Sequence, residues 1–145
     1  NRVDGRPTGH GSPMIETDAD ILIVEDESIL AMLLEDFLDD LGYTPPAVAS
    51  NVAQALRIIE TRDIDFAILD INLGGEQSFP IADALDARGI PYIFMTGYGA
   101  AGVPERLRDH YILQKPYGAD ALRTALASGG EMVDASRKRR SGAGA

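Results

Sequence analysis

The sequence predicts an α/β fold: a single domain with a doubly wound parallel sheet and helices on both faces. Short apolar runs of strand length alternate five times with helix-like segments after about residue 18. The 145 residues are 45% hydrophobic, which suits one compact domain with one core. Several of the apolar runs end in polar or charged residues, as is typical of the ligand-binding edge of such sheets.

The first βα unit has the clearest pattern. Residues 21–24 form a continuous apolar, β-branched run, which is typical of a strand buried on both faces. Seven apolar residues then recur at helical spacing, and Gly42 can end the helix in the left-handed conformation. They are Ile29, Leu30, Leu33, Leu34, Phe37, Leu38 and Leu41.

The second strand, within residues 44–49, contains Pro45 and Pro46. Proline cannot donate to a strand ladder, so this strand is expected to be short and to lie at an edge of the sheet. An edge position matches the flavodoxin-like strand order 2-1-3-4-5. Ser50 is the expected N-cap of the next helix, which ends before Asp63.

A second buried strand, residues 66–69, is ended by Asp70. Beyond a polar loop, Pro80 is well placed in the first turn of a helix that runs through Ala87, with Gly89 closing it. The third unit is therefore also a strand followed by a helix.

The last two units are less regular. Strands are expected at residues 92–95 and 111–114, and the final helix at 119–127. Three glycines between residues 97 and 102 leave only about 104–109 for the fourth helix, which we expect to be short or mobile.

The ends of the chain lack apolar periodicity. We interpret residues 1–17 as a flexible linker or added sequence, residues 18–130 as the domain, and residues 131–145 as a basic disordered tail. Residues 18–130 carry 19 Asp or Glu against seven Lys or Arg, whereas residues 137–140 are all basic.

Composition excludes several functions. A formal charge of −10 argues against nucleic acid as a partner. The apolar stretches are far shorter than the roughly 20 residues of a membrane-spanning helix. The absence of cysteine excludes disulfides and thiolate chemistry, and it fits the cytoplasm.

Charged and hydroxyl side chains end four of the five strands. Glu25 and Asp26 follow the first, Asp70 ends the third, Thr96 the fourth and Lys115 the fifth. In this strand order the first and third strands flank the point where the order reverses, so their acids should face each other.

Clustered carboxylates need a positive partner. At about 4 Å and an effective dielectric of 20, each pair repels by roughly 4 kcal/mol. Oxygen ligands of this kind suit Mg²⁺, which also takes phosphate oxygens. Lys115 and Thr96 are suited to an incoming phosphoryl oxygen, and the carboxylate of Asp70 could accept the phosphoryl group covalently.

Four segments resemble, in order and spacing, the receiver domains of bacterial response regulators, and the match covers residues 18–127. They are Ile23-Val24-Glu25-Asp26-Glu27, Ile68-Leu69-Asp70-Ile71-Asn72-Leu73, Phe94-Met95-Thr96-Gly97-Tyr98 and Leu113-Gln114-Lys115-Pro116. The resemblance implies that Asp70 accepts a phosphoryl group from a histidine kinase or a histidine phosphotransfer protein. Such a domain promotes its own phosphorylation and slow dephosphorylation but is not an enzyme acting on other substrates.

The resemblance also implies a ligand set. Asp26, Asp70 and the backbone carbonyl of Asn72 would hold Mg²⁺, with Glu25 acting through water. Thr96 and Lys115 would then contact the phosphoryl group and reshape the face formed by the fourth helix and fifth strand.

One position departs from the usual family pattern. Ile112 stands where typical receivers carry a Tyr or Phe that swings inward on activation. The run around Gly97 and Gly99 resembles a receiver subgroup with no switch aromatic, so we expect order and disorder of residues 97–109 to replace the ring movement. Tyr98 either controls access of the hydrolysing water or is a solvated loop residue.

Two other classes of protein remain as alternatives. A pseudo-receiver would keep the fold as an interaction module without being phosphorylated. A phosphatase of the haloacid dehalogenase kind wants a second aspartate where Asn72 stands. We expect a receiver that is stand-alone or cut from a hybrid kinase, without a DNA-binding output, monomeric or weakly dimeric, and acting on a downstream protein that the sequence does not name.

Overall fold

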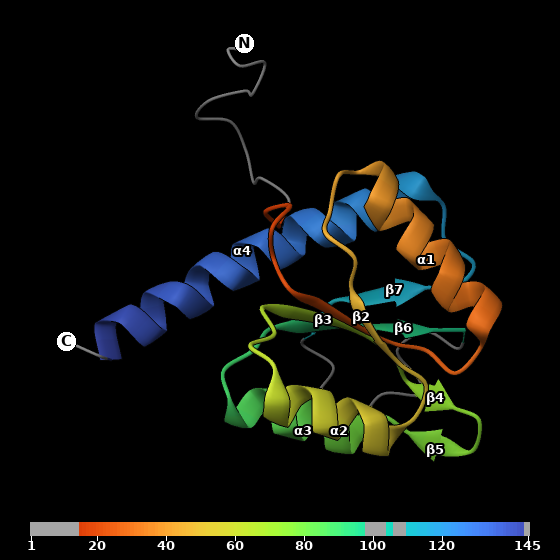
Figure 1. Ribbon diagram of the computed structural model, residues 1–145, viewed down its shortest axis with the longest axis horizontal. Helices are drawn as coiled ribbons and strands as arrows, with labels where there is room; N and C mark the ends of the chain where they lie inside the picture. Colours follow the sequence, from red (N-terminus) through yellow and green to blue (C-terminus); the bar gives the residue numbers. More distant parts are fainter. Residues whose placement is uncertain (1–14, 98–103, 106–109, 144–145) are drawn as a thin grey trace, which may run out of the picture.

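The computed structural model describes residues 15–97, 104–105 and 110–143 (Figure 1). The elements are β1 (Ile21–Val24), α1 (Ser28–Asp40), β2 (Ala47–Ala49), α2 (Val52–Thr61), β3 (Phe66–Asp70), β4 (Asn72–Leu73), β5 (Glu76–Gln77), α3 (Phe79–Ala87), β6 (Tyr92–Thr96), β7 (Ile112–Gln114) and α4 (Ala119–Ala143). Five strands form a parallel sheet in the order β2-β1-β3-β6-β7. The predicted doubly wound fold, with the second strand at an edge, is confirmed.

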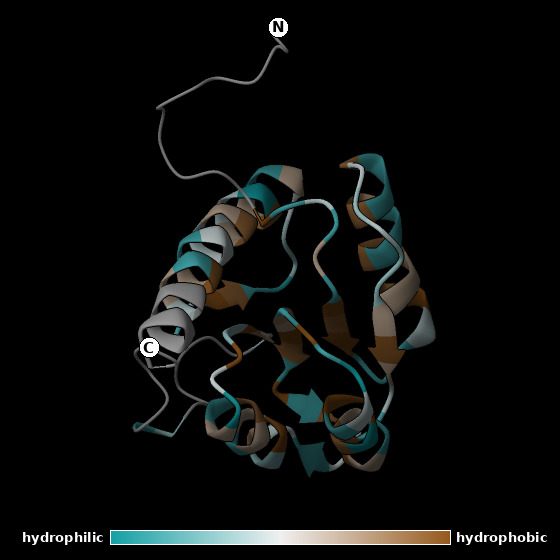
Figure 2. Cartoon of the chain, turned by 60° about the vertical axis from the view of Figure 1, so that its left-hand side comes forward, coloured by the Kyte–Doolittle hydropathy of each residue, from teal (hydrophilic) through white to brown (hydrophobic). Residues whose placement is uncertain are grey.

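Helices cover both faces of the sheet. Helices α1 and α4 lie on one face and α2 and α3 on the other (Figure 1). Successive side chains of β1 alternate between the two layers: Ile21 and Ile23 pack with the first pair of helices, Leu22 and Val24 with the second. The strands of the five-stranded sheet are accordingly mostly apolar, and Figure 2 shows strands of this sheet largely in brown.

Helix α2 begins one residue later than the sequence predicts. Asn51, not Ser50, is its N-cap, because the Asn51 side chain accepts a hydrogen bond of 2.9 Å from the Gln54 amide. Ser50 instead donates its own amide to the side chain of Gln54, at 2.9 Å. Asparagine and serine are both good caps, so composition alone did not separate them.

A small hairpin replaces the expected polar loop after Asp70. Strands β4 and β5 pair antiparallel, Asn72 with Gln77 and Leu73 with Glu76. The two residues between them, Gly74 and Gly75, have φ of 59° and 102°, the left-handed values that a tight two-residue turn requires.

Helix α4 is the largest difference from the predicted elements. It was expected to end at residue 127 and to be followed by a disordered tail, but it continues to Ala143. Val133 and Ser136 are buried, and the Ser136 hydroxyl donates to the carbonyl of Gly89. The helix therefore continues through Gly129 and Gly130, and contacts with the domain accompany its extension.

The chain before β1 also joins the core. Ile15, expected to belong to a flexible linker, is buried, and its carbonyl accepts a hydrogen bond from the Tyr43 hydroxyl. A Cβ at Gly129 would lie 2.9 Å from Ile15 Cδ1 and 2.8 Å from the Phe66 ring, so α4 passes close to both side chains. The expected fourth helix, at about 104–109, lies largely outside the described residues. No helix in the described ranges is long and apolar enough to cross a membrane.

Candidate functional site

The carboxyl-terminal ends of the strands converge on an open pocket of about 1020 Å³. Asp26, Asp70, Thr96 and Lys115, four of the residues that the sequence places at strand ends, line it together. Glu25, the fifth, is buried beside them, and its carboxylate contacts Lys115. The predicted clustering at the reversal of strand order is confirmed, because parallel strands bring their ends to the same edge.

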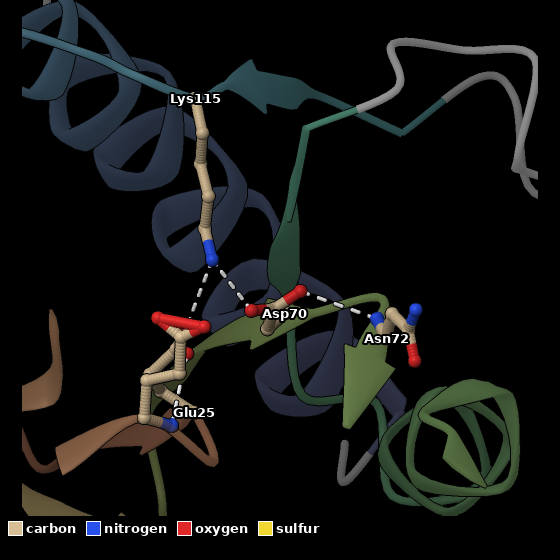
Figure 3. A network of polar contacts seen from close by, with 5 residues as sticks. Glu25, Asp70, Asn72 and Lys115 are labelled. Atoms are coloured by element: carbon tan, nitrogen blue, oxygen red, sulfur yellow. Dashed lines mark hydrogen bonds and ion pairs between the residues drawn. The ribbon is translucent and has the colours of Figure 1, made fainter. Parts of the chain in front are cut away.

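Lys115 joins two buried carboxylates. Its Nζ lies 2.6 Å from Asp70 Oδ2 and 3.0 Å from Glu25 Oε2 (Figure 3). The side chains of Glu25 and Asp70 are only 2% and 9% exposed, whereas that of Lys115 is 23% exposed. Two negative groups therefore share one cation with little help from solvent, and a further positive charge is favoured here.

Backbone amides hold the remaining oxygens of both acids. Asn72 donates its amide to Asp70 Oδ1 at 3.1 Å, and Glu27 donates its amide to Glu25 Oε1 at 3.2 Å. Each carboxylate is thus oriented from two sides, by Lys115 and by the loop that follows its own strand.

The pKa values of both Glu25 and Lys115 are raised in the pocket. Burial of Glu25 and its proximity to Asp70 raise the pKa of Glu25 from 4.5 to about 7, although Lys115 opposes the change. Burial acts to lower the pKa of Lys115, but its hydrogen bonds and charge interactions with Asp70 and Glu25 outweigh burial and raise that pKa. The lysine therefore stays charged, while the glutamate is poised to bind a proton or a cation.

One cluster of carboxylates within the described residues has the spacing of a metal site. Glu25, Asp26 and Asp70 each offer an oxygen, and these oxygens lie within 4.8 Å of one another. Asp26 is exposed at the pocket mouth while the other two are buried. An all-oxygen donor set with an open side fits a hard divalent cation that keeps part of its water shell.

The predicted switch residues do not lie together in the structure, and two of them lie outside the residues that it describes. Gly97 is exposed and lines the pocket, but Tyr98 and Gly99 lie outside the described residues. Ile112 is away from the pocket, opposite Phe94 in the sheet and packed on the α2–α3 side of the core. Tyr111 packs on the other face, as the period of two along a strand predicts.

Three features of the site region were missed from the sequence. The β4–β5 hairpin lines the pocket, and the Gly-Gly pair was its signal. Ile29 and Leu33 were expected on the buried face of α1, yet they are 72% and 52% exposed. His110, to which the sequence pattern gives no role, stacks on Tyr92 with ring centroids 4.5 Å apart.

This fold, with acids and a lysine at the strand ends, defines a class of signalling domain. A sequence model of the response regulator receiver domain matches residues 21–127, and the chain belongs to that family. The structure of SdrG from Sphingomonas melonis Fr1 superimposes with a TM-score of 0.70 at 49% identity, covering 79% of this chain and 98% of that one.

Other relatives are response regulators of several kinds. The phyllosphere-induced regulator PhyR of Methylorubrum extorquens is 31% identical over 68% of this chain and 38% of its own length. A putative NtrX-like response regulator of Rickettsia typhi is 29% identical over 82% of this chain and 26% of its own length. The chain therefore spans about a quarter of the length of this regulator.

Proposed function

We propose that the chain is the phosphoacceptor of a two-component phosphorelay and that Asp70 receives the phosphoryl group. The observation that carries this proposal is the 2.6 Å contact between Lys115 Nζ and Asp70 Oδ2 inside an otherwise acidic pocket. A lysine held there stabilises negative charge at the point where a phosphoryl group would join Asp70.

The transfer has a simple atom balance. A carboxylate oxygen of Asp70 attacks the phosphorus of a phosphohistidine whose other ring nitrogen is protonated, the phosphorus–nitrogen bond breaks, and neutral imidazole leaves with that proton. The product is an acyl phosphate on Asp70. Lys115 and the Asn72 amide, which already contact the two Asp70 oxygens, reduce the repulsion between the carboxylate and the incoming phosphoryl group.

Mg²⁺ is the proposed cofactor. Asp26, Asp70 and the backbone carbonyl of Asn72 would hold it, with Glu25 acting through water, as the resemblance to the family implies. The ion would neutralise charge on the phosphoryl oxygens. The three-carboxylate cluster supports this assignment, and so does the pKa of Glu25, which is raised first by burial and then by the neighbouring Asp70, because a bound cation would stabilise the ionised form of both acids.

The proposed donor is a histidine kinase or a histidine phosphotransfer protein. Three apolar side chains of α1, those of Ile29, Met32 and Leu33, are more than half exposed, and Leu30 of the same helix lines the pocket. We name these three residues the α1 patch. Exposed apolar surface beside a reaction site is typical of protein docking.

The response is proposed to pass to another protein, not to nucleic acid. The net charge of −10 opposes contact with a phosphate backbone. A structure of SdrG described as a beryllofluoride-activated conformation is 52% identical to this chain, which supports activation by a phosphoryl mimic here.

Phosphorylation with a small donor tests the proposal. The wild-type chain, incubated with Mg²⁺ and acetyl phosphate, should gain one phosphoryl group detectable by intact mass, and Asp70→Asn should gain none. Lys115→Met should reduce the rate by about 100-fold, since it removes the charge nearest the acceptor. A wild-type protein that neither gains mass nor responds to beryllofluoride would instead be an interaction module.

A further inference from the structure

We infer that the β4–β5 hairpin sets the relative positions of the two metal-binding aspartates and that Gly74 is the positioning residue. The inference rests on the Mg²⁺ site of the proposed function and assigns a role to a residue outside that ligand set. One short hairpin donates a hydrogen bond to Asp70 at its start, and at its tip it passes so close to Asp26 that a Cβ on Gly74 would lie 2.9 Å from Asp26 Oδ2.

The start of the hairpin is bound to Asp70. Asn72 is the first residue of β4, and its amide donates to Asp70 Oδ1. The side chain of Asn72 also accepts a hydrogen bond of 3.4 Å from the Gly75 amide, so the same residue contacts both the acceptor aspartate and the turn.

The far side of the hairpin is attached to α2. Glu76 Oε1 accepts a hydrogen bond of 3.4 Å from the amide of Val52, the first residue of that helix. The turn is therefore held from both sides: by the Asp70 loop through β4 and by the α2 terminus through β5. Its tip occupies a defined place at the mouth of the pocket.

At that tip, Gly74 leaves room for Asp26. A Cβ built on Gly74 would lie 2.9 Å from Asp26 Oδ2, closer than real Cβ contacts allow. The atom in the way is the end of a flexible side chain, so an alanine at this position would displace the carboxylate and would not break the fold. The absence of a side chain at Gly74 thus permits the present position of a proposed metal ligand.

Gly75 provides a matched control. It lies in the same turn, its φ of 102° is at least as strained for alanine as the 59° of Gly74, and a Cβ there would meet nothing within 4 Å. Backbone strain predicts a larger effect at Gly75, whereas contact with Asp26 predicts the larger effect at Gly74.

Titration calorimetry with MgCl₂ on the full chain separates these cases. Gly74→Ala should weaken Mg²⁺ binding by about tenfold or more, as changes to groups that orient metal ligands commonly do. Gly75→Ala should stay within about twofold of wild type. Equal affinities in the two variants would overturn the inference.

A second measurement needs no metal. The side-chain carboxyl ¹³C resonance of Asp26 in the metal-free protein should shift in Gly74→Ala and not in Gly75→Ala, and an unshifted resonance would contradict the positioning role. If wild type bound no Mg²⁺, the proposed cofactor would fail and this resonance would still decide the role of Gly74. Should Gly74→Ala not fold, adding Asp26→Ala must restore folding, and failure to do so would also overturn the inference.

Discussion

Glu25 shows how one residue can be both structural and functional. Its carboxylate is almost fully buried beside Asp70, and Lys115 supplies the nearby positive charge. A buried acid whose pKa is raised costs stability when it ionises. The protein tolerates that cost at the place where a cation is proposed to bind.

A pH dependence follows from the pKa of Glu25. Because this pKa rises from 4.5 to about 7 on folding, the native state binds more protons than the unfolded state between these values. The contribution of Glu25 to stability is therefore fully present below pH 4.5 and is lost as the pH rises through about 7.

Urea unfolding in EDTA at about pH 5 and about pH 8 measures this dependence. The stability of wild type minus that of Glu25→Gln should fall between the two pH values, since the glutamine variant lacks the titration. A difference that is the same at both values would show that Glu25 does not titrate there.

At the scale of elements, the N-cap residues of α2 and α3 differ in their hydrogen bonding. Asn51 caps α2 with a hydrogen bond, whereas Ser78 precedes α3 without one. The Ser78 hydroxyl is fully buried and has no hydrogen-bond partner within the part of the chain that the structure describes. The N-cap side chain therefore stabilises α2, whereas burial of the N-cap hydroxyl before α3 reduces stability.

Alanine substitution at these two caps should have opposite effects. Asn51→Ala should lower the free energy of unfolding by about 1 kcal/mol, because the Gln54 amide loses its partner. Ser78→Ala should raise it by about 1 kcal/mol, because an unpaired buried hydroxyl is removed. Urea midpoints and slopes measure both, and a loss of stability in Ser78→Ala would mean that its hydroxyl is satisfied.

At the scale of the whole molecule, the α1 patch and the pocket lie on neighbouring surfaces, which suggests how a large donor would approach. Ile29→Ser should leave stability within about 0.5 kcal/mol of wild type, since Ile29 is largely solvent-exposed. It should slow phosphotransfer from a cognate kinase by about tenfold or more, as loss of a docking contact does.

Two controls separate docking from chemistry. Phosphorylation by acetyl phosphate should be unchanged in Ile29→Ser, because a small donor needs no docking surface. Val48→Ser removes an apolar residue that is also exposed, on the edge strand β2, and should not slow transfer from the kinase. A kinase rate equal to wild type in Ile29→Ser would exclude the patch as the docking surface.

The sheet and the chemical groups of the site could be predicted from the pattern of residues along the chain. Apolar runs ending in Asp26, Asp70 and Lys115 identify both, because a buried parallel strand must be apolar along its length and its polar end must lie at the edge. Pro45 and Pro46 similarly predicted the edge strand, since the missing donors act locally.

The neighbours that each residue contacts could not be predicted in this way, because they depend on how the helices and strands pack together. Helix α4 passes the glycine at 129 because Ile15 and Phe66 pack closely against it, and those partners are distant in sequence. The exposed α1 patch, the stacking of His110 on Tyr92 and the close approach of the Gly74 turn to Asp26 are of the same kind. Local periodicity reports propensity and burial, whereas such contacts depend on how separate elements are placed in space.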